Sequence, residues 1–140
     1  MKFFLILHGP NLNLLGKRKL DIYGNRTEDM ILDEIRSKYD NSEFELFQSN
    51  HEGLLIDKIH DCSKYDAIIL NPGAFGHYSY AIRDAIESID IPVVEVHLSD
   101  IMNRENFRKN LILSDVCIST FKGYGIKSYF KAINLLLDLK

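Results

Sequence analysis

The chain has 140 residues, a length that suits one domain with a single core, so we expect one domain over residues 1–140. Hydrophobic residues make up 46% and charged residues 26%, which excludes the disordered and collagen-like classes. The formal net charge of −3 argues against nucleic acid or an anionic membrane as partner, because phosphate neutralisation needs clustered Lys and Arg, and it favours a small molecule instead.

The first predicted element is a strand over Phe3–His8. Its apolar run is shorter than a signal-peptide core and far shorter than a membrane span, which favours a cytoplasmic location. A loop from His8 to Gly24 follows. Thr27–Tyr39 then has the pattern of a helix, with Thr27 as its N-cap and acidic residues in its first turn.

The rest of the chain continues this alternation of short apolar runs and helical patterns. Further strands are predicted at Phe44–Gln48, Ala67–Asn71, Val93–His97 and Val116–Thr120. Further helices are predicted at Glu52–Cys62, Tyr78–Ser88 and Lys127–Leu139. Most of the strands lack polar alternation, as expected when helices cover both faces, but Phe44–Gln48 alternates and is expected at an edge.

Alternating strands and helices predict an α/β fold with a doubly wound parallel sheet of five strands, most simply in the order 2-1-3-4-5 with helices on both faces. In such sheets ligands bind at the carboxyl ends of the strands.

Polar residues cluster at that predicted edge. Four strands deliver hydrogen-bonding or titratable groups to it, namely His8, Asn11, Gln48, Asn50, His51, Asn71, His77, Glu95, His97, Ser99, Asp100, Arg104 and Arg108. This coincidence indicates a site, although loops are polar in general and helix N-caps favour Ser, Asp and Asn.

Several kinds of site fit such an edge. A metal-dependent hydrolase would use the histidines with Glu52 and Glu95, but the chain has no HxH or HExxH unit to pair two ligands on one element. A flavodoxin-like cofactor binder could wrap a phosphate with residues 71–76, on the weak signal of two glycines. A receiver-type module would need acidic residues where His8 and Asn71 stand.

An acid–base site without a cofactor is a further possibility. Tyr23 lies five residues after Arg18 in a basic stretch of the first loop. A tyrosine can act as a base near neutral pH only if its pKa falls by about 2–3 from about 10, and a close arginine in a dry pocket could supply that. The segment alone fits a surface tyrosine beside solvated basic residues equally well.

Glu95 and His97 are two residues apart on a predicted strand and should therefore share a face. A carboxylate beside an imidazole fixes its tautomer, so His97 is a candidate general acid. The alternative is a structural histidine at the end of a strand.

Four ordered blocks of residues resemble type II 3-dehydroquinate dehydratase, and together they span nearly the whole chain. They are residues 8–24 with Asn11, Arg18 and Tyr23, residues 48–53, residues 71–84, and residues 95–99 with Arg104 and Arg108. The resemblance implies a flavodoxin-like subunit that dehydrates 3-dehydroquinate to 3-dehydroshikimate through an enolate, without a metal or other cofactor. It also implies a homo-oligomer of trimers that assemble into a dodecamer.

The resemblance further implies a role for each matching residue. Tyr23 would take the proton beside the ketone, Arg18 would hold it as phenolate, and Asn11 would stabilise the enolate oxygen through water. His97 would protonate the departing hydroxyl, with Glu95 orienting it. Substrate binding would fall to Asn71, His77 and Arg108, to the backbone of Leu98 and Ser99, and to Asp84 reaching into a neighbouring subunit.

The chain also departs from that family at several positions. His8 stands where Asn is usual, Lys19-Leu20 replaces Glu-Pro, Gly76 replaces Thr or Ser, and Asn103 replaces Ala before Arg104. Asp100 stands where Asn is usual and adds a negative charge beside the expected carboxylate site, where it should weaken binding. The Lys19-Leu20 departure is expected to change the behaviour of the lid over the substrate.

Overall fold

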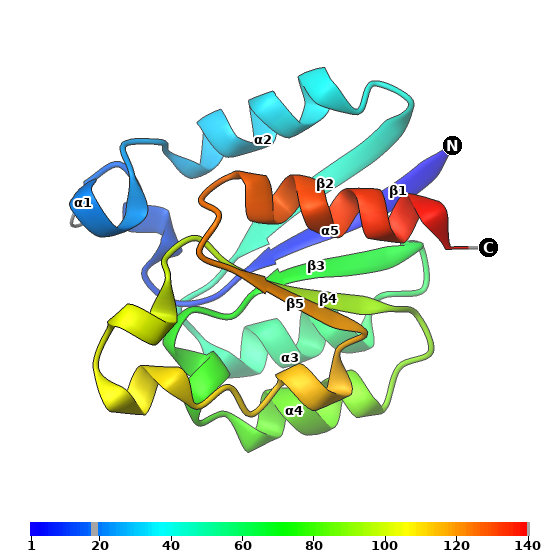
Figure 1. The fold of residues 1–140 in the computed structure, drawn as a ribbon. Helices are drawn as coiled ribbons and strands as arrows, with labels where there is room; N and C mark the ends of the chain where they lie inside the picture. The colour runs from blue at the N-terminus through cyan, green and yellow to red at the C-terminus, as the bar shows by residue number, and fades with distance from the viewer. Residues whose placement is uncertain (18–19, 140) are drawn as a thin grey trace.

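A computed structural model of the chain describes residues 1–17 and 20–139, apart from the side chain of Tyr23. Its centre is a five-stranded parallel sheet in the order β2-β1-β3-β4-β5, which confirms the predicted topology (Figure 1). The strands are β1 (Lys2–His8), β2 (Ser42–Gln48), β3 (Ala67–Asn71), β4 (Val93–His97) and β5 (Ser119–Lys122). As predicted, β2 lies at an edge and pairs with β1 alone.

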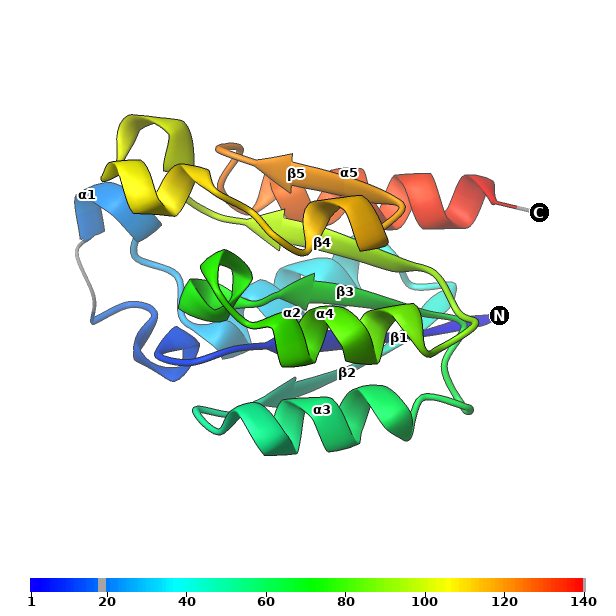
Figure 2. The same ribbon diagram turned by 90° about the horizontal axis from the view of Figure 1, so that it is seen from below.

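Helices cover both faces of the sheet. One face carries α2 (Glu28–Lys38) and α5 (Lys127–Asp138), and the other carries α3 (Glu52–His60) and α4 (Tyr80–Glu87), as Figures 1 and 2 show. The short helix α1 (Leu20–Tyr23) lies beyond the carboxyl ends of the strands (Figure 1). Five 3₁₀ turns complete the described elements: η1 (Leu12–Leu14), η2 (Gly73–His77), η3 (Ile101–Asn103), η4 (Asn106–Lys109) and η5 (Ser114–Val116).

The core has two halves because successive strand residues point to opposite faces. On β1, Phe4 and Ile6 pack under α2 and α5, whereas Leu5 and Leu7 pack against α3 and α4. Each fully buried aliphatic side chain of this kind contributes about 1.5–3 kcal/mol. Burial on both faces explains why these strands are continuous apolar runs.

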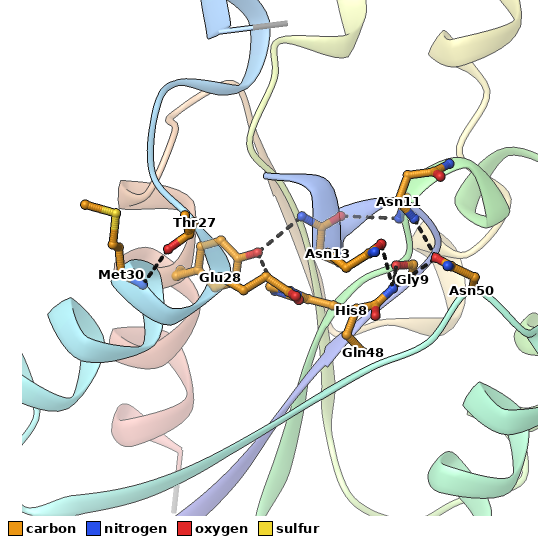
Figure 3. Close-up of polar contacts among 12 residues, drawn as sticks. His8, Gly9, Asn11, Asn13, Thr27, Glu28, Met30, Gln48 and Asn50 are labelled. Atoms are coloured by element: carbon orange, nitrogen blue, oxygen red, sulfur yellow. Dashed lines mark hydrogen bonds and ion pairs between the residues drawn. The ribbon is translucent and has the colours of Figure 1, made fainter. Parts of the chain in front are cut away.

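The helix α2 begins as its sequence predicts. The Thr27 hydroxyl accepts a hydrogen bond from the Met30 amide (Figure 3), and the two atoms are 3.2 Å apart. Glu28 and Asp29 occupy the first turn. The α4 helix begins two residues later than predicted, because Ser79 caps it through the Ile82 amide at 3.0 Å. The third helix ends at His60, two residues before its predicted end.

The prediction of the fifth strand over Val116–Thr120 was wrong by three residues at its start. Val116 closes the 3₁₀ turn η5 and packs, with Cys117, against the core on the α3 and α4 side. Pairing with β4 starts only when the Ile118 amide donates to Val93. The apolar run was therefore a packed turn, and β5 itself is a partly exposed edge strand.

The loops after β1 and β3 meet closely at the carboxyl edge of the sheet. The Gly9 amide donates to the Asn71 carbonyl at 2.8 Å. Gly73 has a φ of 58°, a left-handed conformation that glycine adopts without steric cost. This close approach brings residues from the two strand ends to one place.

Candidate active site

A pocket opens at the carboxyl edge of the sheet, where the sequence predicted it. It holds about 580 Å³ of space that protein atoms do not fill, part of it open to solvent. Residues from the loops after β1, β3 and β4 line it: Pro10, Asn11, Leu12, Asn71, Gly73, Ala74, His77, His97, Leu98, Ser99, Ile101, Arg104 and Arg108. Most of the predicted site residues are thus brought together.

Glu95 and His97 form a buried pair on β4, on the shared face that their spacing predicted. His97 Nε2 lies 2.6 Å from Glu95 Oε2, and Glu95 has no exposed surface. Because a carboxylate accepts hydrogen, it selects the His97 tautomer or charged form that carries a proton on Nε2. The other ring nitrogen, Nδ1, is then the one that can exchange a proton with a molecule in the pocket.

Two hydroxyl groups that the sequence pattern did not indicate hold Glu95 in place. Ser114 Oγ donates to Glu95 Oε1 at 2.9 Å, and Thr120 Oγ1 donates to the same oxygen at 3.3 Å. Thr120 faces Glu95 in the β4–β5 register, so a correct placement of the fifth strand would have revealed it. Ser114 gave no such signal, because it lies in a three-residue turn.

His77 stacks near His97, with ring centroids 6.4 Å apart and planes at 26°. Burial lowers the pKa of His77, the nearby His97 and Arg108 lower it further, and a hydrogen bond to the Asn110 carbonyl acts in the opposite direction. His77 Nδ1 lies 3.0 Å from that carbonyl, so Nδ1 carries the hydrogen. Neutral His77 therefore keeps Nε2 as an acceptor, which suits a substrate hydroxyl.

Asn11 lines the pocket with an unusual backbone. Its φ of 68° lies in the left-handed region, which Asn adopts more readily than most residues. The backbone amide of Asn11 donates to Asn50 Oδ1 at 2.9 Å. Gln48 Nε2 donates to the same Asn50 oxygen and to the Gly9 carbonyl (Figure 3). The loops after β1 and β2 are thereby tied together and fix the position of Asn11.

Asn71 ends β3 and is almost fully buried while lining the pocket. Its Nδ2 donates to the Tyr129 hydroxyl at 3.2 Å, and its Oδ1 accepts from the Gly73 amide at 3.3 Å. These two bonds determine which way the amide faces. One N–H hydrogen and one oxygen lone pair remain for a ligand.

Leu98 and Ser99 follow β4 directly, and α5 and its preceding loop hold this backbone. Ser128 Oγ donates to the His97 carbonyl at 3.2 Å, and the Gly125 amide donates to the Leu98 carbonyl at 3.2 Å. Arg108 supplies positive charge from η4, where its Nε donates to Glu105 at 2.8 Å.

Four predicted site residues are not among those that line this pocket, and one of them, Glu95, lies buried against His97. Asp84 lies exposed on α4, outside the pocket lining. Arg18, like its neighbour Lys19, lies outside the described residues, as does the side chain of Tyr23. The backbone of Tyr23 ends α1, and a cavity beside Leu98 and Ser99 is lined in part by its neighbours Ile22 and Gly24.

Two departures from the family pattern contact each other next to the pocket. Asn103 Nδ2 donates to Asp100 Oδ2 at 2.7 Å, and Asp100 Oδ1 accepts from the Met102 amide at 3.2 Å. Gly76 lies against the catalytic candidates, since a Cβ there would be 3.5 Å from Glu95 Oε2 and 3.6 Å from His97 Cε1. A side chain at position 76 would thus touch the Glu95–His97 pair.

Within residues 1–17 and 20–139, no group of three or more His, Cys, Asp or Glu side chains is arranged to hold a metal ion. Over the same described residues, no helix has the length and apolar character needed to cross a membrane.

Comparison with known proteins gives consistent matches. Residues 2–137 match the family model described as dehydroquinase class II. The 3-dehydroquinate dehydratase of Caldicellulosiruptor saccharolyticus is 48% identical, over 99% of this chain and 99% of its own. The crystal structure of type II dehydroquinase from Butyrivibrio crossotus has a TM-score of 0.94 at 44% identity and covers 98% of each chain. That from Propionibacterium acnes has a TM-score of 0.93 at 34% identity, over 99% of this chain and 98% of the other.

Proposed function

The chain belongs to the class II dehydroquinase family, and from that premise we propose that its pocket dehydrates 3-dehydroquinate to 3-dehydroshikimate, the third step of the shikimate pathway. It is therefore a lyase, a type II 3-dehydroquinate dehydratase. The observation that carries the mechanism is the buried Glu95–His97 pair in a pocket at the carboxyl edge of the sheet.

The reaction needs a base, a partner for an oxyanion and an acid. A proton leaves the carbon beside the ketone, and the electron pair moves onto the ketone oxygen as an enolate. The enolate then re-forms the ketone while the C–O bond to the hydroxyl breaks, and that hydroxyl takes a proton and leaves as water. General acid–base steps of this kind each contribute about 10²–10⁴-fold in rate.

His97 is the proposed acid for the departing hydroxyl. Glu95 holds Nε2 at 2.6 Å, and Ser114 and Thr120 hold Glu95, so the imidazole has a fixed orientation. The buried carboxylate also balances the positive charge of a protonated ring. Glu95 is thus a positioning residue for His97.

The proposed base is Tyr23, held as phenolate by Arg18, and the proposed oxyanion partner is Asn11, acting through water. The roles of Tyr23 and Arg18 rest on the family's sequence pattern. Support for Asn11 comes from its place in the pocket lining and its fixed left-handed backbone.

The remaining lining residues are proposed to bind the polyhydroxylated substrate. Asn71 and His77 offer hydrogen-bond donors and acceptors, and Arg108 offers donors with a positive charge, for the ring hydroxyls. Backbone groups of Leu98 and Ser99 would bind the substrate carboxylate. We also propose that residues 1–140 act as one catalytic domain.

We further propose that the chain works as a homo-oligomer, with trimers assembled into a dodecamer. In support, α4 displays Tyr80, which is 68% exposed, and Asp84 one turn later on the same face. Asp84 does not line the pocket of its own chain, which is consistent with service in a neighbouring one. A cytoplasmic location is proposed because the substrate is an intermediate made and used by other biosynthetic enzymes; cell fractionation tests it.

A spectrophotometric assay tests the proposed function. Purified protein treated with a chelator should convert 3-dehydroquinate to a product with the absorbance of a conjugated enone. Tyr23→Phe and His97→Ala should each lower kcat by about 10²-fold or more while the circular dichroism spectrum stays native. Loss of activity with chelator would indicate a metal enzyme, and a bound chromophore without dehydration would indicate a cofactor-binding module. Near-wild-type turnover in either variant would refute the residue assignment.

A further inference from the structure

His8 is a wholly buried titratable side chain that the proposed mechanism does not use. It ends β1 on the face covered by α2 and α5, in register with Asn71 on β3. Buried imidazoles need partners for both ring nitrogens, and His8 has them on two different helices. The position of His8 beside a pocket residue raises the question of what these contacts determine.

A chain of hydrogen bonds runs from α2 through His8 to the pocket. His8 contacts Glu28 (Figure 3), and its Nδ1 lies 2.6 Å from Glu28 Oε2. His8 Nε2 lies 2.8 Å from the Tyr129 hydroxyl, which in turn accepts from Asn71 Nδ2 at 3.2 Å. Four residues from four elements, α2, β1, α5 and β3, thus form one continuous network.

When the His8 ring is neutral, the chemistry of the groups gives this network a single direction. The Glu28 carboxylate can only accept, so His8 carries a hydrogen on Nδ1, and a neutral ring then accepts at Nε2. Tyr129 must donate its hydroxyl hydrogen to Nε2, and burial keeps that hydrogen in place by raising the pKa of Tyr129. The tyrosine oxygen is left as an acceptor, and among the Asn71 side-chain atoms only Nδ2 can donate to it.

The consequence reaches the pocket through the amide of Asn71. An asparagine amide can turn over and exchange its donor and acceptor ends at little steric cost. Here the Tyr129 oxygen selects Nδ2 on one side, and the Gly73 amide selects Oδ1 on the other. Asn71 therefore presents a defined donor and a defined acceptor to whatever occupies the pocket.

We propose that His8, oriented by Glu28 and acting through Tyr129, is a positioning residue that sets the amide of Asn71 for a substrate hydroxyl. This inference rests on the proposed function, because it assigns the hydroxyl to 3-dehydroquinate. None of the three residues lines the pocket, so their effect on the substrate passes through Asn71. A purely structural network, which only held α2 and α5 to the sheet, would affect stability and not substrate binding.

The sharpest variant is Tyr129→Phe, which removes one oxygen and keeps the ring. One lost orienting hydrogen bond should raise KM for 3-dehydroquinate by about 3–10-fold and change kcat by less than about 2-fold, because the amide binds ground state and transition state alike. The matched control is Tyr65→Phe, which removes a buried hydroxyl bonded to Glu45 away from the pocket. It should lose stability with KM unchanged.

A double-mutant cycle separates positioning from structure. In an Asn71→Ala background, Tyr129→Phe should raise KM no further, since the amide that it orients is gone. A KM rise that persists in that background, or an unchanged KM in Tyr129→Phe alone, would overturn the proposal.

Nitrogen-15 NMR of the histidine rings tests the same network in the wild-type protein without substrate. The His8 signals, assigned by their loss in His8→Asn, should show hydrogen on Nδ1 and a bare Nε2. Hydrogen on Nε2 in an active wild-type enzyme would overturn this inference and leave the proposed function intact. A wild-type protein that does not dehydrate 3-dehydroquinate would overturn the proposed function, and with it the substrate assigned to Asn71.

Discussion

At the scale of single residues, Asp100 has a structural role in addition to the effect of its charge on substrate binding. Its two carboxylate oxygens are engaged by the Met102 amide and by Asn103, so the residue caps η3. It also follows Ser99, whose backbone is a proposed site for the substrate carboxylate. As a cap, Asp100 therefore stabilises the local fold. Its negative charge, in contrast, repels the substrate carboxylate and lowers the affinity for substrate.

Asp100→Asn separates these two effects. Asparagine keeps an oxygen for the Met102 amide but removes the negative charge, so KM should fall by about 2–3-fold at low ionic strength, and the difference should shrink as salt screens it. Steady-state kinetics at two salt concentrations measure this. Asp33→Asn, an exposed change on α2, serves as the control. An equal or higher KM in Asp100→Asn would contradict the expectation.

His77 provides a pH prediction at the same scale. Its pKa in the folded chain lies below the ordinary value of about 6.5, because the ring is buried and faces His97 and Arg108. As the pH falls through about 6.5, the unfolded chain takes up a proton on His77 before the folded chain does. His77 therefore contributes a loss of stability below about pH 6.5.

An NMR titration of the substrate-free protein should place the His77 midpoint below 6.5. Arg108→Ala should move that midpoint upward, because it removes one of the positive charges that oppose protonation. A midpoint at or above the ordinary value would show that the ring is not desolvated as described.

At the scale of elements, the sequence predicted strands better than turns. Ala67–Asn71 and Val93–His97 were predicted to the residue, because short apolar runs between turn residues have few alternatives. Arg108 and Ser114 lie in 3₁₀ turns that are too short to show a periodicity. The fifth strand was misplaced because an apolar run in a packed turn looks like a strand.

The same limit applies to the candidate site. Strand-end residues such as Asn71 and His97 could be predicted, because the carboxyl ends of parallel strands converge at one edge. Tyr129, which accepts from Asn71, and Ser114, which donates to the His97 partner Glu95, could not be predicted, since these contacts depend on how distant helices and turns dock on the sheet. Local patterns carry no information on such docking.

The close approach of the loops after β1 and β3 gives a prediction at the element scale. A Cβ at Gly9 would lie 2.1 Å from the Pro72 carbonyl oxygen, a backbone atom that cannot move alone. Gly9→Ala should therefore destabilise the fold by about 3 kcal/mol and separate the two loops. Urea denaturation measures the change in the free energy of unfolding.

Gly53→Ala is the matched control for Gly9→Ala. Gly53 lies in α3, and a Cβ there meets no atom within 4 Å. Alanine should thus stabilise the helix by up to about 1 kcal/mol. Equal effects of the two substitutions would mean that backbone entropy, and not the contact with Pro72, determines the outcome.

At the scale of the whole molecule, the two faces of the sheet serve the pocket differently. Glu95 and His97 belong to the face under α3 and α4, whereas His8 and Asn71 belong to the face under α2 and α5. The proposed proton donor and the proposed binding amide therefore have separate supports. Substitutions in the network around Glu95 and His97 should affect kcat, and substitutions in the network around His8 and Asn71 should affect KM. The effects of the two kinds of substitution should be nearly additive.

The proposed oligomer can be tested by restoring activity between two defective chains. His97→Ala removes the acid from its own pocket, and Asp84→Ala removes a side chain proposed to serve a neighbour's pocket. A pocket with intact His97 on one chain and intact Asp84 on the next should be active. If the two chains assemble at random after coexpression in equal amounts, about a quarter of the pockets satisfy both conditions, giving about a quarter of wild-type activity.

The measurement compares the activity of coexpressed, doubly tagged oligomers with that of a mixture of the two separately purified variants. The mixture should show only the average activity of the two variants. Sedimentation equilibrium fixes the number of chains in each sample. Activity of the coexpressed sample no higher than that average would mean that Asp84 acts within its own chain or not at all. Because Asp84 lies exposed on α4 and outside its own pocket, we expect the coexpressed sample to be more active than that average.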